Sequence, residues 1–250
     1  AIANQKGGVA KTTTTHNLGA AMAAAGKRVL LIDLDSQASL TISVGLEPLE
    51  VERTIVDVLR KDGTPLMECV QQLSDRLHIV TSIIDLAPME MELLSRASRE
   101  KILDRALREA RGQYDYILID CMPSLGMLTI NAVAAADSIL IPVQAAYLPV
   151  KGLEQLIKTI GKVKRQINPR LEIEGILMTM VDIRTTYARD ISKLLIENYG
   201  SRVRIFNSSI PMSVRAAEIS AEGTSIYKHD PYGKVAKAYQ SLTEEVLGNE

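Results

Sequence analysis

A short loop rich in glycine and lysine constrains this chain more than any other feature. It follows the apolar run 1–3, precedes a helical pattern, and reads Lys6, Gly7, Gly8, Val9, Ala10, Lys11, Thr12, Thr13. Between a strand and a helix, the backbone N–H groups of such a loop converge on phosphate at the positive end of the helix. Lys11 can neutralise phosphate charge, and Thr12 supplies a hydroxyl where P-loop enzymes coordinate magnesium. The loop therefore predicts that these eight residues bind ATP with Mg2+.

Short apolar runs alternate with longer amphipathic stretches along the rest of the chain, as they do when crossover helices join parallel strands. We expect strands at 29–35, 77–82, 116–120, 138–143, 175–181 and 203–205. We expect helices at 12–25, 89–111, 151–166, 187–199 and 230–247, the last with Asp230 as its N-cap. No linker, repeat or low-complexity tract interrupts this pattern. The sequence predicts one P-loop NTPase domain over residues 1–250, an α/β fold with a doubly wound, mostly parallel sheet and helices on both faces.

The composition limits the cellular compartment and the kinds of functional site that we expect. The net charge is −1, so any nucleic-acid or membrane partner must meet a local patch. Two cysteines, Cys69 and Cys121, lie far apart and form no CxxC pair, which argues against a disulfide scaffold or a zinc site. No run approaches the ~18 apolar residues of a membrane span. We expect a soluble cytoplasmic protein.

Carboxylates stand where the second and fourth apolar runs end. Asp33 and Asp35 close one run, and Asp120 closes Tyr116-Ile117-Leu118-Ile119. Ligands of α/β sheets bind outside the carboxyl ends of the strands, so we expect these side chains to meet the phosphate loop. Asp120 has the form of a Walker B carboxylate that holds magnesium through water. A strand-end aspartate that caps the following turn is the alternative for Asp33 and Asp35.

The phosphate loop departs from a standard Walker A loop and resembles the deviant Walker A of the ParA/MinD family of ATPases. Gln5-Lys6 precede the glycines, 33–37 resembles the family's Asp-x-Asp-Pro-Gln, and 120–124 resembles its Asp-x-Pro-Pro-Ser. The resemblance spans the chain from Asn4 to the last helix and is closest to the ParA/Soj-type partition ATPases.

This resemblance implies roles for individual residues. Lys6 would reach the phosphates of a partner subunit, so that ATP holds a homodimer together. Asp35 would orient or activate the attacking water, which makes Lys6, Lys11 and Asp35 the catalytic residues. Thr12, Asp33 and Asp120 would be the magnesium residues, with support of the loop as the alternative for Asp33.

Three positions qualify the resemblance. Ala10 stands where the family has glycine, and its methyl group is tolerated if the local φ is negative; otherwise nucleotide affinity or turnover is in question. Met180 and Pro211 match segments that flank adenine, although core packing and a turn explain them nearly as well.

DNA is the surface that the resemblance favours. The resemblance implies slow ATP hydrolysis stimulated by a ParB-type partner, non-specific binding of double-stranded DNA in the ATP state, and a nucleoid-associated location. Arg184 and Arg215 would contact DNA. The stretch 151–170 also suits phosphate binding, although it equally resembles a solvated helix face. Its basic residues are Lys151, Lys158, Lys162, Lys164, Arg165 and Arg170, against Glu154 alone.

Three other functions compete with DNA partition. A MinD-like ATPase cycles on membranes, but 241–250 is acidic and lacks a basic face, so we expect no membrane attachment. A third surface, such as another positioned cargo, stays open. An iron-sulfur donor or a small-molecule kinase lacks support, because the sequence offers no cysteine pair, second substrate pocket or tyrosine-rich tail. Cys69 and Cys121 are better explained as small buried hydrophobes.

Overall fold

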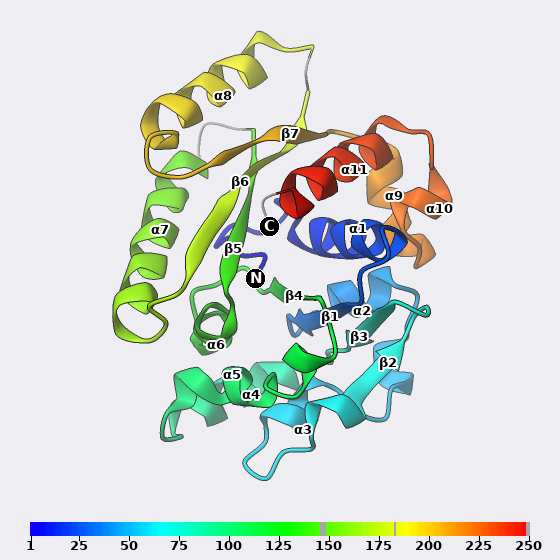
Figure 1. The fold of residues 1–250 in the computed structure, drawn as a ribbon, viewed down its shortest axis with the longest axis vertical. Coiled ribbons are helices and arrows are strands. Elements are labelled where there is room, and N and C mark those ends of the chain that lie inside the picture. Colours follow the sequence, from blue (N-terminus) through cyan, green and yellow to red (C-terminus); the bar gives the residue numbers. More distant parts are fainter. Residues whose placement is uncertain (146–148, 183, 249–250) are drawn as a thin grey trace.

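A single twisted sheet runs through the computed structural model, which describes residues 1–145, 149–182 and 184–248 (Figure 1). Its strand order is β2 (Val70–Gln72), β3 (Leu77–Val80), β1 (Val29–Leu34), β4 (Tyr116–Cys121), then β5 (Ser138–Gln144), β6 (Glu172–Val181) and β7 (Ile205–Pro211). Ile2 bridges the two parts of the sheet, because it pairs with both Asp120 and Leu140. All named pairs are parallel except β2 with β3. The mostly parallel α/β fold is therefore confirmed.

Helices cover both faces of the sheet (Figure 1). The core on one face includes α1 (Lys11–Ala24), α2 (Ser39–Ser43), α9 (Val214–Glu222), α10 (Ile226–His229) and α11 (Lys234–Leu247). The core on the other face includes α3 (Ile55–Leu59), α4 (Leu86–Leu94), α5 (Ile102–Ala106), α6 (Met127–Ala135), α7 (Pro149–Gln166) and α8 (Thr186–Tyr199).

Alternation along β1 explains the two cores. Leu30 and Ile32 belong to one apolar cluster, whereas Val29 and Leu31 belong to the other, and all four are fully buried. Each such side chain contributes roughly 1.5–3 kcal/mol on burial. Gly19 lets α1 approach the sheet closely, since a Cβ there would lie 2.6 Å from Leu31 Cδ2. This close contact fixes the helix whose first turn carries Lys11 and Thr12.

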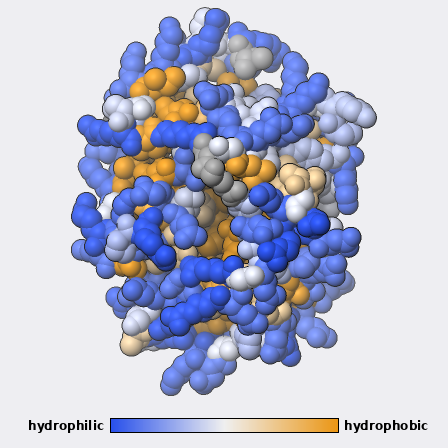
Figure 2. Space-filling model, in the orientation of Figure 1, coloured by the Kyte–Doolittle hydropathy of each residue, from blue (hydrophilic) through white to orange (hydrophobic). Residues whose placement is uncertain are grey.

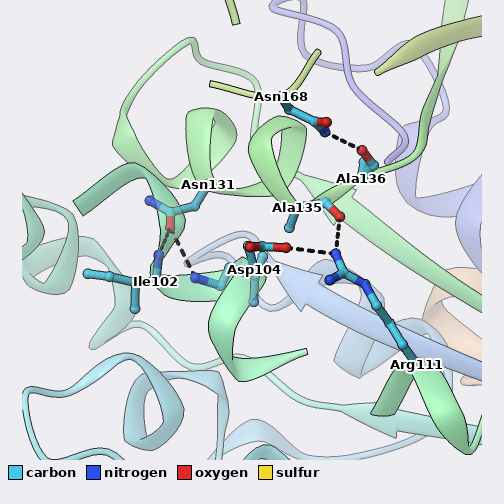
Figure 3. A network of polar contacts seen from close by, with 8 residues as sticks. Ile102, Asp104, Arg111, Asn131, Ala135, Ala136 and Asn168 are labelled. Carbon is cyan, nitrogen blue, oxygen red and sulfur yellow. Dashed lines mark hydrogen bonds and ion pairs between the residues drawn. The ribbon is translucent and has the colours of Figure 1, made fainter. Parts of the chain in front are cut away.

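The single helix expected at 89–111 is wrong. The segment breaks into α4, a 3₁₀ turn at Arg99–Lys101, α5 and a second 3₁₀ turn at Ala110–Gly112. The buried Asn131 of α6 enforces the break, because its Oδ1 accepts hydrogen bonds from the N–H groups of Ile102 and Leu103, both at 3.1 Å (Figure 3). A side chain about 30 residues away therefore caps the start of α5.

Other elements also differ from the expectation, either in where they begin and end or in being unexpected. The last helix begins at Lys234 with Gly233 as N-cap, so the expected N-cap role of Asp230 is wrong. The strand expected at 203–205 instead spans Ile205–Pro211. The three-residue strand β2 was not expected, because it is an antiparallel strand at the end of the sheet. Among the described residues, no helix is both long and apolar enough to cross a membrane.

Candidate phosphate and magnesium site

The phosphate loop connects the segment around Ile2 to α1, at the carboxyl end of β4. Gly8 has φ of +66°, and Ala10, the N-cap of α1, has φ 63° and ψ 33°. The negative φ that would accommodate Ala10 is therefore absent. A left-handed conformation costs an L-residue roughly 1–2 kcal/mol. A glycine would adopt this conformation without strain, and Ala10 lacks that freedom.

Lys11 lies inside the loop. Its side chain is almost buried, and its Nζ donates a hydrogen bond to the backbone carbonyl of Lys6 at 3.2 Å. Burial lowers the pKa of Lys11, and the nearby carboxylate of Asp120 opposes that shift. The structure thus brings one buried ammonium group, the turns of the loop and the start of α1 into one place.

Thr12 and Asp120 meet directly. The Thr12 hydroxyl donates to Asp120 Oδ2 at 2.6 Å, and the Thr15 hydroxyl lies 3.3 Å from Oδ1. Burial raises the pKa of Asp120 to about 8, and the charge of Asp33 adds to the shift. A hydroxyl and a carboxylate are the hard oxygen donors that magnesium prefers, so this pair fits Mg2+.

Asp33 is fully buried but already satisfied by the protein. Its Oδ2 accepts from the backbone N–H and the hydroxyl of Thr41, both at 2.8 Å, and its Oδ1 accepts from the N–H of Asp35 at 3.1 Å. Burial raises its pKa to about 6. This geometry favours support of the loop that carries Asp35, while the magnesium role of Asp33 stays a prediction. Nothing local in the sequence pointed to Thr41.

Asp35 stands partly exposed beyond the end of β1, where its Oδ1 accepts from the N–H of Gln37 at 3.0 Å. Lys6 is exposed, and its Nζ lies 3.4 Å from Gln144 Oε1 at the end of β5. Its own N–H donates to the side chain of Asn4, which in turn donates to the carbonyl of Pro142. Asn4 and Gln144 therefore shape the loop, and sequence reasoning gave neither a role.

Met180 and Pro211 end two neighbouring strands. Val181 pairs with Pro211, and Met180 has φ 51°, a conformation that is rare for a bulky residue. The adjacent Thr179 is buried and its hydroxyl donates to the carbonyl of Val9 at 3.1 Å. This bond ties the end of β6 to the phosphate loop. The structure brings the two expected adenine-flanking residues to one edge, and their contact with adenine stays a prediction.

The two expected DNA-contacting arginines lie outside this site, and each pairs with an acid. Arg184 makes two bonds to Asp182, at 2.9 and 3.0 Å, and its side chain is 86% exposed. Arg215, at the start of α9, pairs with Asp230 at 2.9 Å. Both side chains are open to solvent, and neither is a free cation.

The basic stretch 151–170 is partly neutralised in the same way. Lys158 pairs with Glu154 at 2.7 Å and Lys164 with Glu172 at 2.6 Å. The side chain of Lys151 lies outside the described residues. A solvated helix face accounts for much of this stretch.

The two cysteines are buried and free. Burial raises the pKa of Cys69 to about 11 and that of Cys121 to about 12, so both thiols stay protonated at neutral pH. Over the described part of the chain, no three His, Cys, Asp or Glu side chains gather as a metal site.

Comparison with known proteins gives the family. The sequence model of the AAA domain family matches residues 1–173. The sporulation initiation inhibitor protein Soj of Bacillus subtilis (strain 168) is 42% identical over 249 residues, which cover 100% of this chain and 98% of that protein. The chromosome partitioning protein ParA of Caulobacter vibrioides is 39% identical over 252 residues, 100% of this chain and 94% of that protein.

A solved structure has a similar fold. Cobyrinic acid a,c-diamide synthase from Mycobacterium smegmatis, with a bound ATP analog and magnesium, superposes with a TM-score of 0.88 at 36% identity. The match covers 98% of this chain and 92% of that chain. The motifs, the fold and these relatives agree, and the chain belongs to the ParA/Soj-type partition ATPases of the deviant Walker A (ParA/MinD) family.

Proposed function

We propose that this single-domain chain is a magnesium-dependent ATPase that dimerises on ATP, binds double-stranded DNA without sequence preference, and partitions DNA with a ParB-type activator. The observation that carries the ATPase proposal is the meeting of Lys11, Thr12 and Asp120 at the first turn of α1. Relatives named Soj and ParA support the partition role, and the related structure with an ATP analog and magnesium supports the ligands. A cytoplasmic, nucleoid-associated location follows from this role.

Each residue of the site has a separate role in ATP hydrolysis. Backbone N–H groups of the loop and Lys11 bind the phosphates, and Asp35 positions the attacking water. Magnesium, held by Thr12 and Asp120, supplies charge stabilisation when it is bound. Asp33 holds the segment that carries Asp35 through the Thr41 and Asp35 hydrogen bonds. Because the water-positioning group is a single partly exposed carboxylate, turnover is slow until an activator fixes the site.

Lys6 couples ATP to dimerisation. Among the described residues its exposed side chain has one hydrogen bond, to the Gln144 side chain, so it can turn towards a partner subunit's phosphates at little cost. Lys6→Ala should then bind ATP as a monomer, which light scattering with and without Mg-ATP would show. A Lys6→Ala protein that still dimerises on ATP would remove this role.

The DNA proposal is tested by fluorescence anisotropy with arbitrary duplex DNA. Wild-type protein loaded with ATP should bind, with an affinity that falls steeply as salt rises, because phosphate contacts release counterions. Arg184→Ala with Arg215→Ala should abolish binding. The control is Arg28→Ala with Arg53→Ala, which removes two exposed arginines that are also paired with acids, Asp115 and Glu68. Equal binding by the nucleotide-free protein would overturn the ATP switch, and absence of binding in both states would favour another cargo surface.

A further inference from the structure

Five basic side chains surround a cavity of about 520 Å³ between α3 and α5, near the lower end of Figure 1. The face in Figure 2 is mostly hydrophilic around these elements. The basic residues of this cavity, the basic pocket, are Arg60, Lys61, Arg96, Arg105 and Arg108. Glu109 is the one carboxylate in its lining. The segment after α3 supplies the first two cations, and the segment from Arg96, just after α4, to Arg108, just after α5, supplies the other three.

Two of the five cations have a partner within the protein. Arg60 pairs with Asp57 at 3.1 Å, and Arg96 donates to the backbone carbonyl of Leu59. The side chains of Lys61, Arg105 and Arg108 have no ion-pair partner among the described residues. The whole chain carries a net charge of −1, so a generally basic surface does not explain this excess. Like charges gathered around one concavity repel each other, and a bound anion would offset that repulsion.

The chemistry of the lining points to phosphate. Four of the five cations are arginines, whose planar fork of donors matches phosphate oxygens in pairs. The cavity volume falls in the ~300–1,000 Å³ range of small-molecule sites, and a single open concavity of that size matches a compact ligand rather than the length of an extended duplex. Val58, Leu66 and Ile102 contribute apolar lining beside the charges.

Arg105 belongs to α5 and Arg108 follows two residues after its end, and this element is supported by other parts of the fold. Asn131 caps the start of α5, and Arg111 bonds to both Asp104 at 2.9 Å and the carbonyl of Ala135 at 2.7 Å (Figure 3). Arg105 and Arg108 are three positions apart, so they project from neighbouring places on the chain. A backbone that is held in place loses less entropy on binding than a mobile loop does.

We propose that the basic pocket is a second anion site, separate from the phosphate loop, for a compact soluble ligand that carries two or more phosphate groups. The basic pocket shares no residue with the phosphate loop, Asp35 or Asp120. The inference therefore stands independently of the proposed ATPase and DNA-binding functions.

The test uses inorganic tripolyphosphate as the probe in isothermal titration of the full chain, with excess ADP present to occupy the phosphate loop. Wild-type protein should bind one probe per chain in the basic pocket. Arg105→Gln with Arg108→Gln should weaken this binding about tenfold or more, because two bidentate donors are lost. Arg105→Lys with Arg108→Lys keeps the charge, removes the fork and should give an intermediate loss. Arg189→Gln with Arg202→Gln changes the charge equally on exposed residues of and after α8, and should bind like wild type.

Two results would overturn the proposal. One is equal tripolyphosphate affinity in wild type and in the Arg105→Gln, Arg108→Gln protein, with thermal unfolding showing that both are folded. The other is short duplex DNA that displaces the probe and loses affinity by the same factor in that variant, which would make the basic pocket a nucleic-acid surface. A direct ADP titration reports separately on the phosphate loop, so failure of the ATPase proposal is distinguishable.

Discussion

Three charged side chains are buried at the phosphate end of the molecule, which comprises the phosphate loop with Asp33 and Asp120, whereas the two arginines expected to contact DNA are exposed. Lys11, Asp33 and Asp120 are buried, and hydroxyl and backbone groups hold them at fixed distances. Arg184 and Arg215 are exposed, and each is held by one acid. A buried charge acts in a low dielectric, whereas an exposed pair is screened by water and salt. Substitution of a buried group at the phosphate end should therefore have a large effect, and substitution of the acids that pair with the two arginines should have a smaller, salt-dependent one.

Removal of the buried ammonium group should give the largest effect. Lys11→Ala should lower ATP turnover by roughly 10²–10³-fold, the usual loss when one preorganised charge donor is removed. The measurement is phosphate release together with nucleotide titration. Lys237→Ala removes an exposed lysine of α11 and should leave both unchanged. A Lys11→Ala protein that is folded and turns over at the wild-type rate would contradict the site.

Buried His16 should make the stability of the α1 region depend on pH. Burial, aided by Lys228, lowers the pKa of His16 to about 4, and its Nδ1 lies 3.3 Å from the Ser43 hydroxyl. The unfolded chain takes up this proton at about 6.5, so the contribution is complete above that pH and is lost as pH falls towards 4. The loss by pH 4 should be about 3 kcal/mol.

His16→Asn cannot titrate in this range, and Asn can still bond to Ser43. The difference in free energy of unfolding between wild type and His16→Asn, followed by urea denaturation from pH 7 to 4, isolates the histidine. Asp33 and Asp120 have raised pKa values, so their contributions fall as pH rises, but they act in both proteins. A difference that stays constant with pH would contradict a buried neutral His16.

Ala10 offers a smaller test at the phosphate end. Ala10→Gly should raise the free energy of unfolding by about 0.5–1 kcal/mol, because the relief of the left-handed strain exceeds the added entropy of the unfolded chain. Urea denaturation measures the change. Gly19→Ala in the same helix should destabilise, since its Cβ would lie 2.6 Å from Leu31. A destabilised Ala10→Gly protein would show that φ 63° carries no strain there.

The sequence predicted those parts of the fold and site that are local. Lys11 and Thr12 follow a recognisable loop, and Asp120 ends an apolar strand, so their meeting could be anticipated. The hydrogen bonds of Thr41 to Asp33 and the cap of Asn131 on α5 join positions that no local pattern connects. For this reason the loop-supporting geometry of Asp33 and the break at 95–101 emerged only in three dimensions. The positive φ of Ala10 is likewise a property of the folded loop.

The acids that hold the two arginines should produce the smallest effect, and one that opposes the arginine substitutions. Asp182 and Asp230 neutralise the guanidinium groups that would meet DNA phosphates. Asp182→Asn with Asp230→Asn should therefore raise the affinity of the ATP-loaded protein for duplex DNA by roughly two- to fivefold at low salt, because exposed pairs are weak. Asp75→Asn with Asp85→Asn makes the same charge change at two exposed acids elsewhere and controls for net charge. Because counterion screening weakens both the pairs and the DNA contacts, the gain should shrink as salt rises. If the two double variants gain affinity equally, Asp182 and Asp230 act on DNA binding only through the net charge of the protein. The arginines would then differ from the buried groups of the phosphate end only in their exposure to solvent.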